Sequence, residues 1–326
     1  MVLEEVVVMG RLDPVMNADR TGASTNLNTE NIQRMPTISR TISDYTRMSP
    51  LSNGSSFAGR DNRFNNYTVD GNVYNNNFGL GSGQFAGTNP ISMDAIEEIQ
   101  INIAPFDVRQ GGFTGANVNA ITRSGTNEFR GSIYTYFRNE YMQGRKIGDD
   151  SFSVDEALTN IYGVSLGGPI IRDRLFFFVS VEQEESSVPG DSRLAARPGL
   201  SGPNVTRVPA AEMDFVREQM MSIYGYETGA YEDYPFANEA LRLNFRIDYN
   251  INPNHRASIR YNRYSAFRDV TINGNSVRNV TRYGNTNRFG MEALTFRNAN
   301  YSVDNNVNSF VGELNSVFGT RFANNL

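Results

Sequence analysis

The chain has 326 residues, of which 39% are hydrophobic and 11% aromatic, and its formal net charge is -5. This length suits two domains or one large β-rich domain, and the mild charge shows no footprint for a nucleic-acid partner. The sequence contains no cysteine and a single histidine, His255, which excludes disulfides and thiol chemistry and leaves little room for histidine-based catalysis or metal binding. We therefore expect a protein that is not an enzyme, with no catalytic residue, no cofactor and no metal site.

The first ten residues, MVLEEVVVMG, contain an acidic pair and no basic segment, so they do not form a signal peptide. Leu3 to Val8 predicts a short strand, and the residues from Arg11 to Asn28 are polar. A cytosolic protein and a fragment whose leader lies upstream both remain open. No apolar run approaches 18 residues, so no transmembrane helix is predicted, whereas the strands of a transmembrane β-barrel would give only a weak hydropathy signal.

A compact unit of short helices and strands is predicted before Gly125. Pro36 ends the first helix, for which Thr29 is the expected N-cap, and Asp70-Gly71 suits the positive φ angles of a tight hairpin turn. The Asn- and Gly-rich stretch from Tyr74 to Gly87 predicts a loop. The expected elements are helices at Thr29–Met35 and Thr41–Met48, a hairpin at Asn66–Val73, a helical turn at Met93–Ile96, and strands at Glu98–Ile103 and Val118–Thr122.

Beyond Gly125 the hydrophobic pattern changes to a period of two, which is typical of strands with one apolar face. The clearest strand is Leu241–Tyr249, where leucine, phenylalanine, isoleucine and tyrosine alternate with Arg242, Asn244, Arg246 and Asp248. About six such strands are expected, at Glu128–Asn139, Tyr162–Leu166, Phe177–Glu184, Leu241–Tyr249, Ala257–Asn262 and Phe310–Phe318.

The connections between these strands alternate in length. Short turns are predicted at Gly168–Arg174 and Asn250–Asn254, and long polar loops at Glu140–Asn160, Glu184–Ala237 and Arg268–Asp304. Short turns on one rim and long loops on the other are typical of an outer-membrane barrel, whereas a soluble sandwich rarely needs three loops of this length. Six strands cannot close a barrel, and an open edge in lipid is costly, so the chain is expected to be part of a longer protein.

Two motifs resemble those of enzymes, but the elements predicted around them are not the ones that these motifs require. Gly163-Val164-Ser165-Leu166-Gly167 matches the G-x-S-x-G nucleophile elbow, with Asp248 and His255 following in hydrolase order, but Pro169 and a basic turn stand where the elbow needs a helix. The stretch from Gly81 to Ala86 matches G-x-G-x-x-A, but no strand precedes it. We interpret the first motif as a strand with small residues on one face, and the second as a loop.

Two loops could contact an ion or a ligand. The acidic residues Asp149, Asp150 and Asp155 lack the spacing of a calcium loop, so solvated charge is favoured over weak calcium binding. A second loop sets amide groups beside aromatic rings, a combination that suits a ligand, although a polar loop chosen for its turns is the favoured alternative from these residues alone. The residues of this ligand-facing candidate are Tyr74, Asn75, Asn76, Asn77 and Phe78.

The stretch from Asp94 to Asn139, DAIEEIQINIAPFDVRQGGFTGANVNAITRSGTNEFRGSIYTYFRN, resembles the plug-to-barrel junction of TonB-dependent outer-membrane receptors, within them the Oar-like group common in Bacteroidetes and myxobacteria. The residues Asn31–Pro36, Tyr67–Asn72 and Gly167–Phe178 resemble the start of the plug, its hairpin, and the first periplasmic turn with the strand after it. The resemblance implies an α+β plug domain followed by antiparallel strands of an incomplete transmembrane β-barrel. The implied division is a TonB-box segment and linker at residues 1–19, a plug at 20–127 with a covalent tether at Gly111–Asn127, and barrel strands at 128–326.

The same resemblance implies a location in the outer membrane of a Gram-negative cell, in contact with its lipid, and the energy-coupled uptake of a nutrient such as a peptide or another large substrate. The plug and the TonB box would face the periplasm, where TonB, in complex with ExbB and ExbD, pairs with the box. A surface substrate-binding lipoprotein is a further expected partner. The alternative is a surface adhesion or signalling protein that uses the same barrel without transport. The implied TonB-coupling residues are Leu3, Glu4, Glu5, Val6, Val7 and Val8, and the polar face of the barrel lumen is predicted at Arg242, Asn244, Arg246, Arg260 and Asn262.

Overall fold

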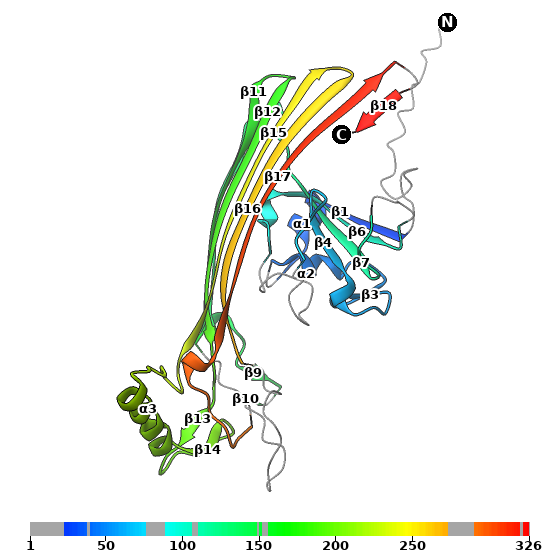
Figure 1. Cartoon of the computed structure of the whole chain (residues 1–326). Coiled ribbons are helices and arrows are strands. Elements are labelled where there is room, and N and C mark those ends of the chain that lie inside the picture. The colour runs from blue at the N-terminus through cyan, green and yellow to red at the C-terminus, as the bar shows by residue number, and fades with distance from the viewer. Residues whose placement is uncertain are drawn as a thin grey trace, which may run out of the picture.

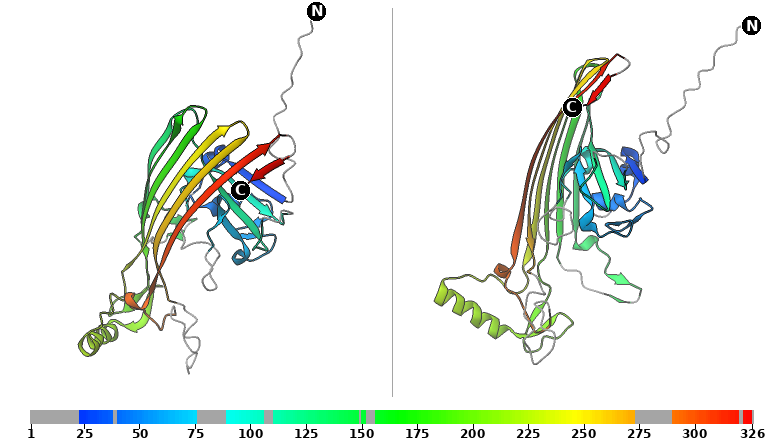
Figure 2. Two further views of the ribbon diagram at one scale, coloured as in Figure 1. Left: turned by 45° about the horizontal axis from the view of Figure 1, so that its top comes forward. Right: turned by 45° about the vertical axis from the view of Figure 1, so that its right-hand side comes forward.

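The computed structural model of the chain describes residues 23–37, 40–75, 89–105, 110–148, 150–151, 156–272, 290–319 and 322–325. Two sheets dominate it, a small five-stranded sheet and a long seven-stranded sheet (Figure 1). The small sheet lies against one face of the long sheet, which we call the inner face (Figure 2). The predicted order, an α+β unit followed by antiparallel strands, is confirmed.

The small sheet has the strand order β1-β6-β7-β4-β5, in which β4 and β7 are parallel and the other pairs antiparallel. Two short helices and two 3-10 turns complete this small unit. Its elements are β1 Ala23–Asn28, α1 Thr29–Arg34, α2 Ile42–Thr46, β2 Ser52–Asn53, β3 Ser56–Phe57, η1 Asn62–Phe64, β4 Asn66–Val69, β5 Asn72–Val73, η2 Met93–Ala95, β6 Ile96–Ile103 and β7 Ala116–Thr122.

Local sequence explains most of these boundaries. The turn between β4 and β5 has positive φ at both Asp70 (49°) and Gly71 (82°), as the Asp-Gly dipeptide predicts. The N-cap of α1 is Asn28, one residue before the predicted Thr29, because the Asn28 side chain accepts a 2.9 Å hydrogen bond from the Asn31 amide. The second helix begins at Ile42, one residue after the predicted Thr41, which is its N-cap, and it ends at Thr46 rather than Met48.

The long sheet is a meander in which each strand pairs antiparallel with its neighbours in the chain. Its short turns and long strands follow the alternating pattern of the sequence, and the described part of the sheet is open, with β8 and β18 at its edges. The strands are β8 Arg130–Asn139, β11 Leu158–Ile171, β12 Leu175–Pro189, β15 Pro235–Asn252, β16 His255–Val270, β17 Tyr301–Phe318 and β18 Phe322–Asn325.

The two faces of the long sheet differ in chemistry. The outer face carries exposed apolar side chains, of which Ile133 is 89% and Phe310 71% exposed. From Leu241 to Tyr249 this apolar face extends eight residue steps, about 27 Å along the strand, close to the roughly 25 Å apolar band of outer-membrane barrels. The inner face carries buried polar residues, among them Arg242 and Asn262.

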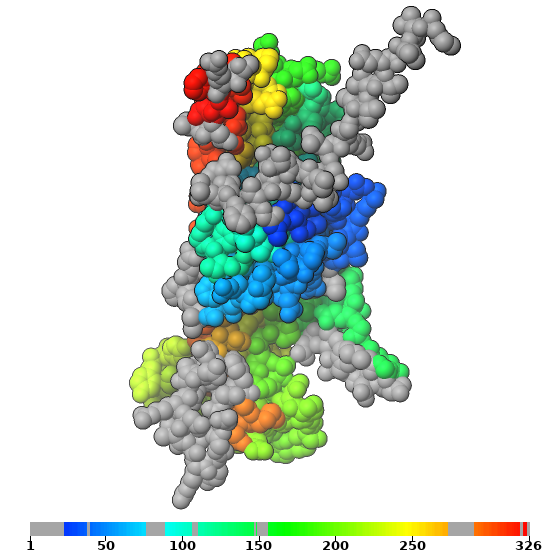
Figure 3. Space-filling model, turned by 90° about the vertical axis from the view of Figure 1, so that its right-hand side faces the viewer, coloured from blue at the N-terminus to red at the C-terminus, as the bar shows by residue number. Residues whose placement is uncertain are grey.

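One hydrophobic core fills the small unit and reaches the long sheet. It includes Ile99 and Val118 of the small sheet together with Phe178 and Tyr264 of the long sheet. Figure 3 shows the small unit, blue to cyan, covering the middle of the long sheet. The small unit is therefore seated on the inner face by packing as well as by polar contacts.

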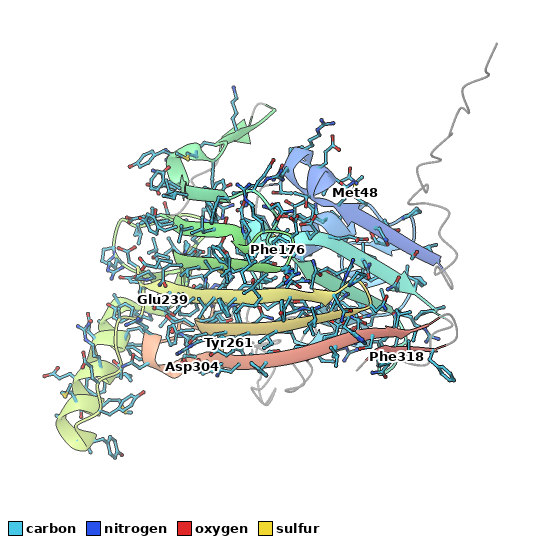
Figure 4. The ribbon with its side chains drawn as sticks, turned by 90° about the horizontal axis from the view of Figure 1, so that it is seen from above. Met48, Phe176, Glu239, Tyr261, Asp304 and Phe318 are labelled. Carbon is cyan, nitrogen blue, oxygen red and sulfur yellow. The ribbon has the colours of Figure 1, made fainter. Side chains whose placement is uncertain are left out.

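The predicted long loops contain structure that the sequence analysis missed. The connection between β12 and β15 and the connection between β16 and β17 pack together at one end of the long sheet, and we call their described residues the outer unit. Figure 4 shows Glu239 of β15 and Asp304 of β17 toward this end of the sheet. The elements in the connections are η3 Glu140–Met142, β9 Lys146–Ile147, β10 Asp150–Ser151, β13 Leu194–Ala196, β14 Val205–Pro209, α3 Ala210–Tyr224 and η5 Arg297–Ala299.

Among the residues that the structure describes, no helix combines the length and the apolar character needed to cross a membrane.

Candidate functional site

A buried polar cluster joins the small unit to the inner face of the long sheet. Its centre is the carboxylate of Glu182 on β12, which accepts hydrogen bonds from Arg242 Nη1 at 2.9 Å, Tyr134 OH at 2.6 Å and Ser92 Oγ at 2.8 Å. Ser92 belongs to the turn before β6, so one carboxylate holds three strands of the long sheet and the small unit together. We call Ser92, Tyr134, Glu182, Glu184 and Arg242 the seam cluster.

Arg242 uses every edge of its guanidinium group in this cluster. Nη1 pairs with Glu182, Nη2 lies 2.5 Å from Glu184 Oε2, and Nε donates to the carbonyl of Asn89 in the small unit at 2.6 Å. The side chain is 4% exposed. A buried charge of this kind costs free energy unless it is fully paired, and removing one partner of a buried pair costs about 3–5 kcal/mol.

Gly163 makes room for the tyrosine of the seam cluster. It lies directly opposite Tyr134 in the β8–β11 pairing, and a Cβ atom at this position would stand 2.0 Å from Tyr134 Cζ. The Tyr134 ring therefore lies across the backbone of β11, and its hydroxyl points toward Glu182 and Ser92. Glycine at residue 163 is thus explained by aromatic packing rather than by a nucleophile elbow.

A second ionic contact lies beside the cluster. Arg40 Nη2 bonds Asp94 Oδ2 at 2.8 Å, and its Nη1 donates to Tyr136 OH on β8 at 2.7 Å. Burial raises the pKa of Asp94 above its ordinary value, and the nearby Glu182 carboxylate adds to the rise, while Arg40 opposes it. The turn that carries Ser92 and Asp94 therefore brings one carboxylate into a partly dry interface.

The five inner-face residues predicted from alternation all lie on that face, and they contact the small unit to different degrees. Arg246 Nη1 donates to the Thr122 carbonyl of β7 at 2.8 Å, while its other nitrogens pair with Asp248. Arg260 pairs within the long sheet with Glu313 at 2.6 Å. Asn244 and Asn262 hydrogen-bond each other and are buried. Arg242 and Arg246 thus reach the small unit through its carbonyl groups, and the described ion pairs of all three arginines are with carboxylates of the long sheet.

A cavity of about 760 Å³ opens beside the seam cluster, between the small unit and the long sheet. From the small unit it is lined by the segment around Arg40 and by Asn89 and Met93. From the long sheet it is lined by inner-face residues of five strands, including Glu182, Glu184 and Arg242. The cavity lies toward the end of the sheet that carries the outer unit, since the β12 lining continues from Glu182 to Val188.

The other predicted site residues are placed differently. Tyr74, expected to face a ligand, is instead 1% exposed in the core, and burial raises its pKa to about 12. Asn75 accepts from the Tyr67 amide and donates to Asn66, so it forms part of the hairpin. The remaining candidates, residues 3–8, 76–78 and 81–86, and the side chains of the acidic cluster at 149, 150 and 155, lie outside the described residues.

The enzyme-like motif is explained by the fold. Gly163 to Gly167 run straight within β11, so the sharp strand-to-helix turn of a nucleophile elbow is missing there. Ser165 Oγ shares a 2.8 Å hydrogen bond with Ser132 Oγ, and Asp248 is paired with Arg246. Within the described ranges, no group of three or more histidine and carboxylate side chains is arranged to hold a metal ion.

Ser92 and Tyr134 were not singled out from the sequence, although alternation placed Glu182 and Glu184 on the polar face of their strand. The signal that could have found the cluster is the register: Glu182 pairs directly with Arg242 and with Gly163. Both acidic residues follow the i, i+2 spacing of one face; Glu182 lies opposite Arg242, and Glu184 lies opposite Ala240, two residues along the same strand.

Comparisons with known proteins agree with this architecture. Residues 121–325 match a family model described as outer membrane beta barrel domain. A relative, the TonB-dependent transporter Oar of Myxococcus xanthus, is 28% identical over 195 residues, which cover 54% of this chain and 18% of that protein. The chain thus spans about a fifth of the length of this curated relative.

Solved structures share the fold. The siderophore receptor PirA of Acinetobacter baumannii has a TM-score of 0.55 at 16% identity, over 91% of this chain and 38% of that one. The outer membrane transporter YddB of Escherichia coli has a TM-score of 0.56 at 12% identity, over 91% of this chain and 37% of that one. These relatives are described as transporters and receptors.

Proposed function

We propose, from the premise that the chain belongs to the outer membrane beta barrel domain family and resides in the outer membrane, that it acts in the energy-coupled uptake of a nutrient. In this proposal the small unit is the plug of a TonB-dependent receptor and the long sheet is part of the wall around it. The similarity to the Oar transporter supports this assignment. The fold shared with solved transporters and receptors is consistent with it.

The observation that carries the proposal is the chemistry of the contact between the small unit and the long sheet. Direct hydrogen bonds join them at Ser92, Asn89, Thr122 and Asn72, and each partner on the long sheet is a polar side chain. Water can replace such hydrogen bonds at little enthalpic cost, whereas an apolar contact exposed to water would not be compensated. A polar seam therefore suits a unit that must be fixed at rest and rearrange during transport.

We further propose the division of the chain that the resemblance implies. Residues 1–19 would hold the TonB box and a linker, residues 20–127 the plug, and residues 128–326 the first strands of a barrel that a longer Oar-like receptor completes. Gly125 supports a fixed tether between plug and wall, because a Cβ atom there would lie 2.4 Å from the Phe177 carbonyl oxygen and 2.9 Å from that of Gly168. The backbone at Gly125 therefore lies in close contact with the backbone of the long sheet.

The coupling partner in this proposal is TonB, acting with ExbB and ExbD, and the segment it pulls is Leu3 to Val8. A short β-prone segment can pair with a partner by strand addition, in which backbone hydrogen bonds supply the affinity. The cargo would be a peptide or another large nutrient, and a surface lipoprotein could deliver it. These partners are inferences from the family resemblance.

The test of coupling is Val7→Pro in the receptor in its native membrane. Proline removes a backbone donor from the pairing segment, so uptake should fall to the level of a strain without TonB, while substrate binding at the cell surface persists. Met16→Pro, outside the proposed box, is the matched control and should leave uptake unchanged. Unchanged uptake in Val7→Pro would show that this segment is not the coupling site.

A second candidate function, surface adhesion or signalling without transport, is favoured by one observation. The two outer connections fold together into a unit with its own small core, which is more structure than an open passage needs. This alternative predicts loss of cell contacts in a deletion strain that grows normally on every nutrient. Energy-dependent uptake that is lost in the same strain favours transport.

A further inference from the structure

One row of polar side chains crosses the inner face of the long sheet in the cavity beside the seam cluster. The strand pairing places Thr159 opposite both Arg138 and Ser186, and Asn238 opposite both Ser186 and Arg268. All five residues line the cavity. Neighbouring strands lie about 4.8 Å apart, so the row extends about 19 Å across five strands. We call it the arginine row, because a guanidinium group stands at each end.

The two terminal arginines differ from the other arginines of the inner face. Arg242, Arg246 and Arg260 are each paired with a carboxylate of the long sheet. Neither Arg138 nor Arg268 has an ion pair or a side-chain hydrogen bond in the part of the chain that the structure describes. Their positive charge is therefore available to a ligand in the cavity.

The middle of the row offers neutral hydrogen-bonding groups. Thr159 Oγ1 and Ser186 Oγ lie 3.3 Å apart, and each hydroxyl retains further capacity to donate or accept. The Asn238 Oδ1 atom is buried and, among the described residues, has no hydrogen-bond partner. A buried amide oxygen without a partner is costly, so a rotation of the Asn238 amide toward a ligand donor such as a peptide N–H would be favourable.

The rest of the cavity lining mixes apolar and polar side chains. Met35 and Met93 line the cavity from the small unit, and Tyr136 and Phe137 of β8 line it beside Arg138. A ligand in the cavity would therefore meet charges, amides and aromatic rings on the wall, and on the small unit two methionines beside polar side chains that include Arg40. This combination fits an extended chain with acidic groups better than a compact sugar.

We propose that the arginine row binds the transported substrate, and that this substrate is an elongated anion whose carboxylate or phosphate groups engage Arg138 and Arg268. Arginine suits this role because its planar guanidinium group can bind either anion with two hydrogen bonds. The inference rests on the proposed uptake function and adds to it the chemical class of the cargo. It also explains why the two arginines face the cavity without carboxylate partners of their own.

The test measures binding of two probes to the receptor purified in detergent from its native membrane. Hexaglutamate, about 20 Å long when extended, matches the length of the row and represents carboxylates. A linear polyphosphate of six phosphates represents phosphates, and triglutamate, about half as long, tests the need for length. Affinity is measured by calorimetry at two salt concentrations, because binding by charge should weaken as salt increases.

Arg138→Gln and Arg268→Gln should each weaken binding of the preferred probe about tenfold, because each removes a charged hydrogen-bonding partner. Triglutamate is long enough to reach only one of the two arginines, so it should bind more weakly than hexaglutamate. For the same reason, one of the two variants should bind triglutamate as well as the natural receptor does. The matched control is Arg263→Gln, on the same strand as Arg268 but exposed and on the outer face, which should leave affinity unchanged.

The outcomes separate this inference from the uptake function. A receptor whose uptake depends on Val7 but which binds neither probe overturns the substrate class and leaves the transport proposal standing. Equal loss of binding in Arg263→Gln also overturns it, because the effect would then be one of net charge. Binding of one probe only, with loss in both cavity variants, supports the arginine row and identifies carboxylate or phosphate as the recognised group.

Discussion

At the scale of single residues, Gly163 has no side chain, and this leaves room for the Tyr134 ring on which three further side chains depend. Its backbone supports the Tyr134 ring, the Tyr134 hydroxyl bonds Glu182, and Glu182 bonds both Arg242 and Ser92. A change at this glycine should therefore act on the small unit, although the two do not belong to the same sheet. Gly163 is not itself part of the seam cluster, but the contacts among residues 92, 134, 182 and 242 depend on it.

Gly163→Ala should lower the free energy of unfolding by about 1–3 kcal/mol, because the added methyl group overlaps the Tyr134 ring and the ring must leave its place. It should also loosen the turn at Ser92, which can be followed as faster hydrogen exchange in residues 91–96. Gly312→Ala is the matched control, since a Cβ atom at Gly312 of β17 meets nothing within 4 Å. Equal effects of the two variants would contradict the supporting role of Gly163.

Alternation in the sequence predicted the side of the sheet on which Arg242, Asn244 and Arg246 lie, because the strand period of two is a local property. It could not predict the partner of each residue. The pairing of Arg242 with Glu182 depends on the register between β12 and β15, which are separated by a connection of 45 residues (190–234). The Ser92 contact depends in addition on how the small unit is seated.

At the scale of elements, the outer unit contains secondary structure that the local sequence pattern did not predict. The sequence analysis assigned residues 184–237 to a polar loop, yet they contain α3. The signals for this helix are Pro209 at its N-cap and Gly225, which ends it in the left-handed conformation with φ of 61°. Only Met213 of this helix is buried, so its hydrophobic pattern is weak, and the helix is held by the neighbouring segments.

Those neighbouring segments come from two different connections. Arg193, paired with Asp191, donates from Nη1 to the carbonyls of Gly290 and Ala293, and the Arg297 amide donates to the Ala230 carbonyl. Neither connection could build this unit alone. Sequence reasoning treats each loop separately, and for that reason it missed a structure that exists only between them.

Glu232 gives the outer unit a dependence on pH. The Arg197 guanidinium lowers the pKa of Glu232 below its ordinary value, and the Ala195 amide also donates to this carboxylate, at 2.9 Å. The stabilisation is therefore fully present above pH 4.5, the value without these partners, and is lost as the pH falls through the lowered pKa. We expect the outer unit to open more readily in acid while the long sheet stays intact.

Glu232→Gln should reduce the protection of the Ala195 amide from hydrogen exchange at neutral pH by about 1 kcal/mol, a typical value for a partly exposed pair. The difference from the natural protein should disappear once the pH is below the lowered pKa of Glu232. Glu212→Gln, on exposed α3, is the control. A difference that stays constant with pH would show that the carboxylate charge is not the cause.

At the scale of the whole molecule, the small unit is held on one face of the long sheet by a hydrophobic core and a polar seam together. The prediction of an α+β unit followed by barrel-type strands is confirmed, because both parts follow from local periodicity. How the parts meet was not predictable from the sequence. The contact between Asn72 Nδ2 and Ser309 Oγ, at 2.8 Å, joins residues 237 positions apart.

This contact allows a test of movement. The chain has no cysteine, so Asn72→Cys with Ser309→Cys introduces a single pair that a short bifunctional thiol reagent can join. If the small unit must leave the wall during transport, the joined receptor should lose uptake, keep surface binding, and show the same wall stability. Each single variant treated with the same reagent is the control. Full uptake by the joined receptor would limit the rearrangement to parts of the small unit away from β5.

The meander of the long sheet has a consequence for how the protein is made. Each of its strands pairs with strands next to it in the order of the sheet's strands along the chain, so a strand that is added during assembly of the sheet needs only its predecessor as a template. The small unit comes earlier in the chain than every strand of the long sheet. It can therefore fold first, and the strands of the long sheet can then assemble against it one after another. In the proposed receptor, closing the wall after the small unit has folded would avoid threading a folded domain into a completed barrel.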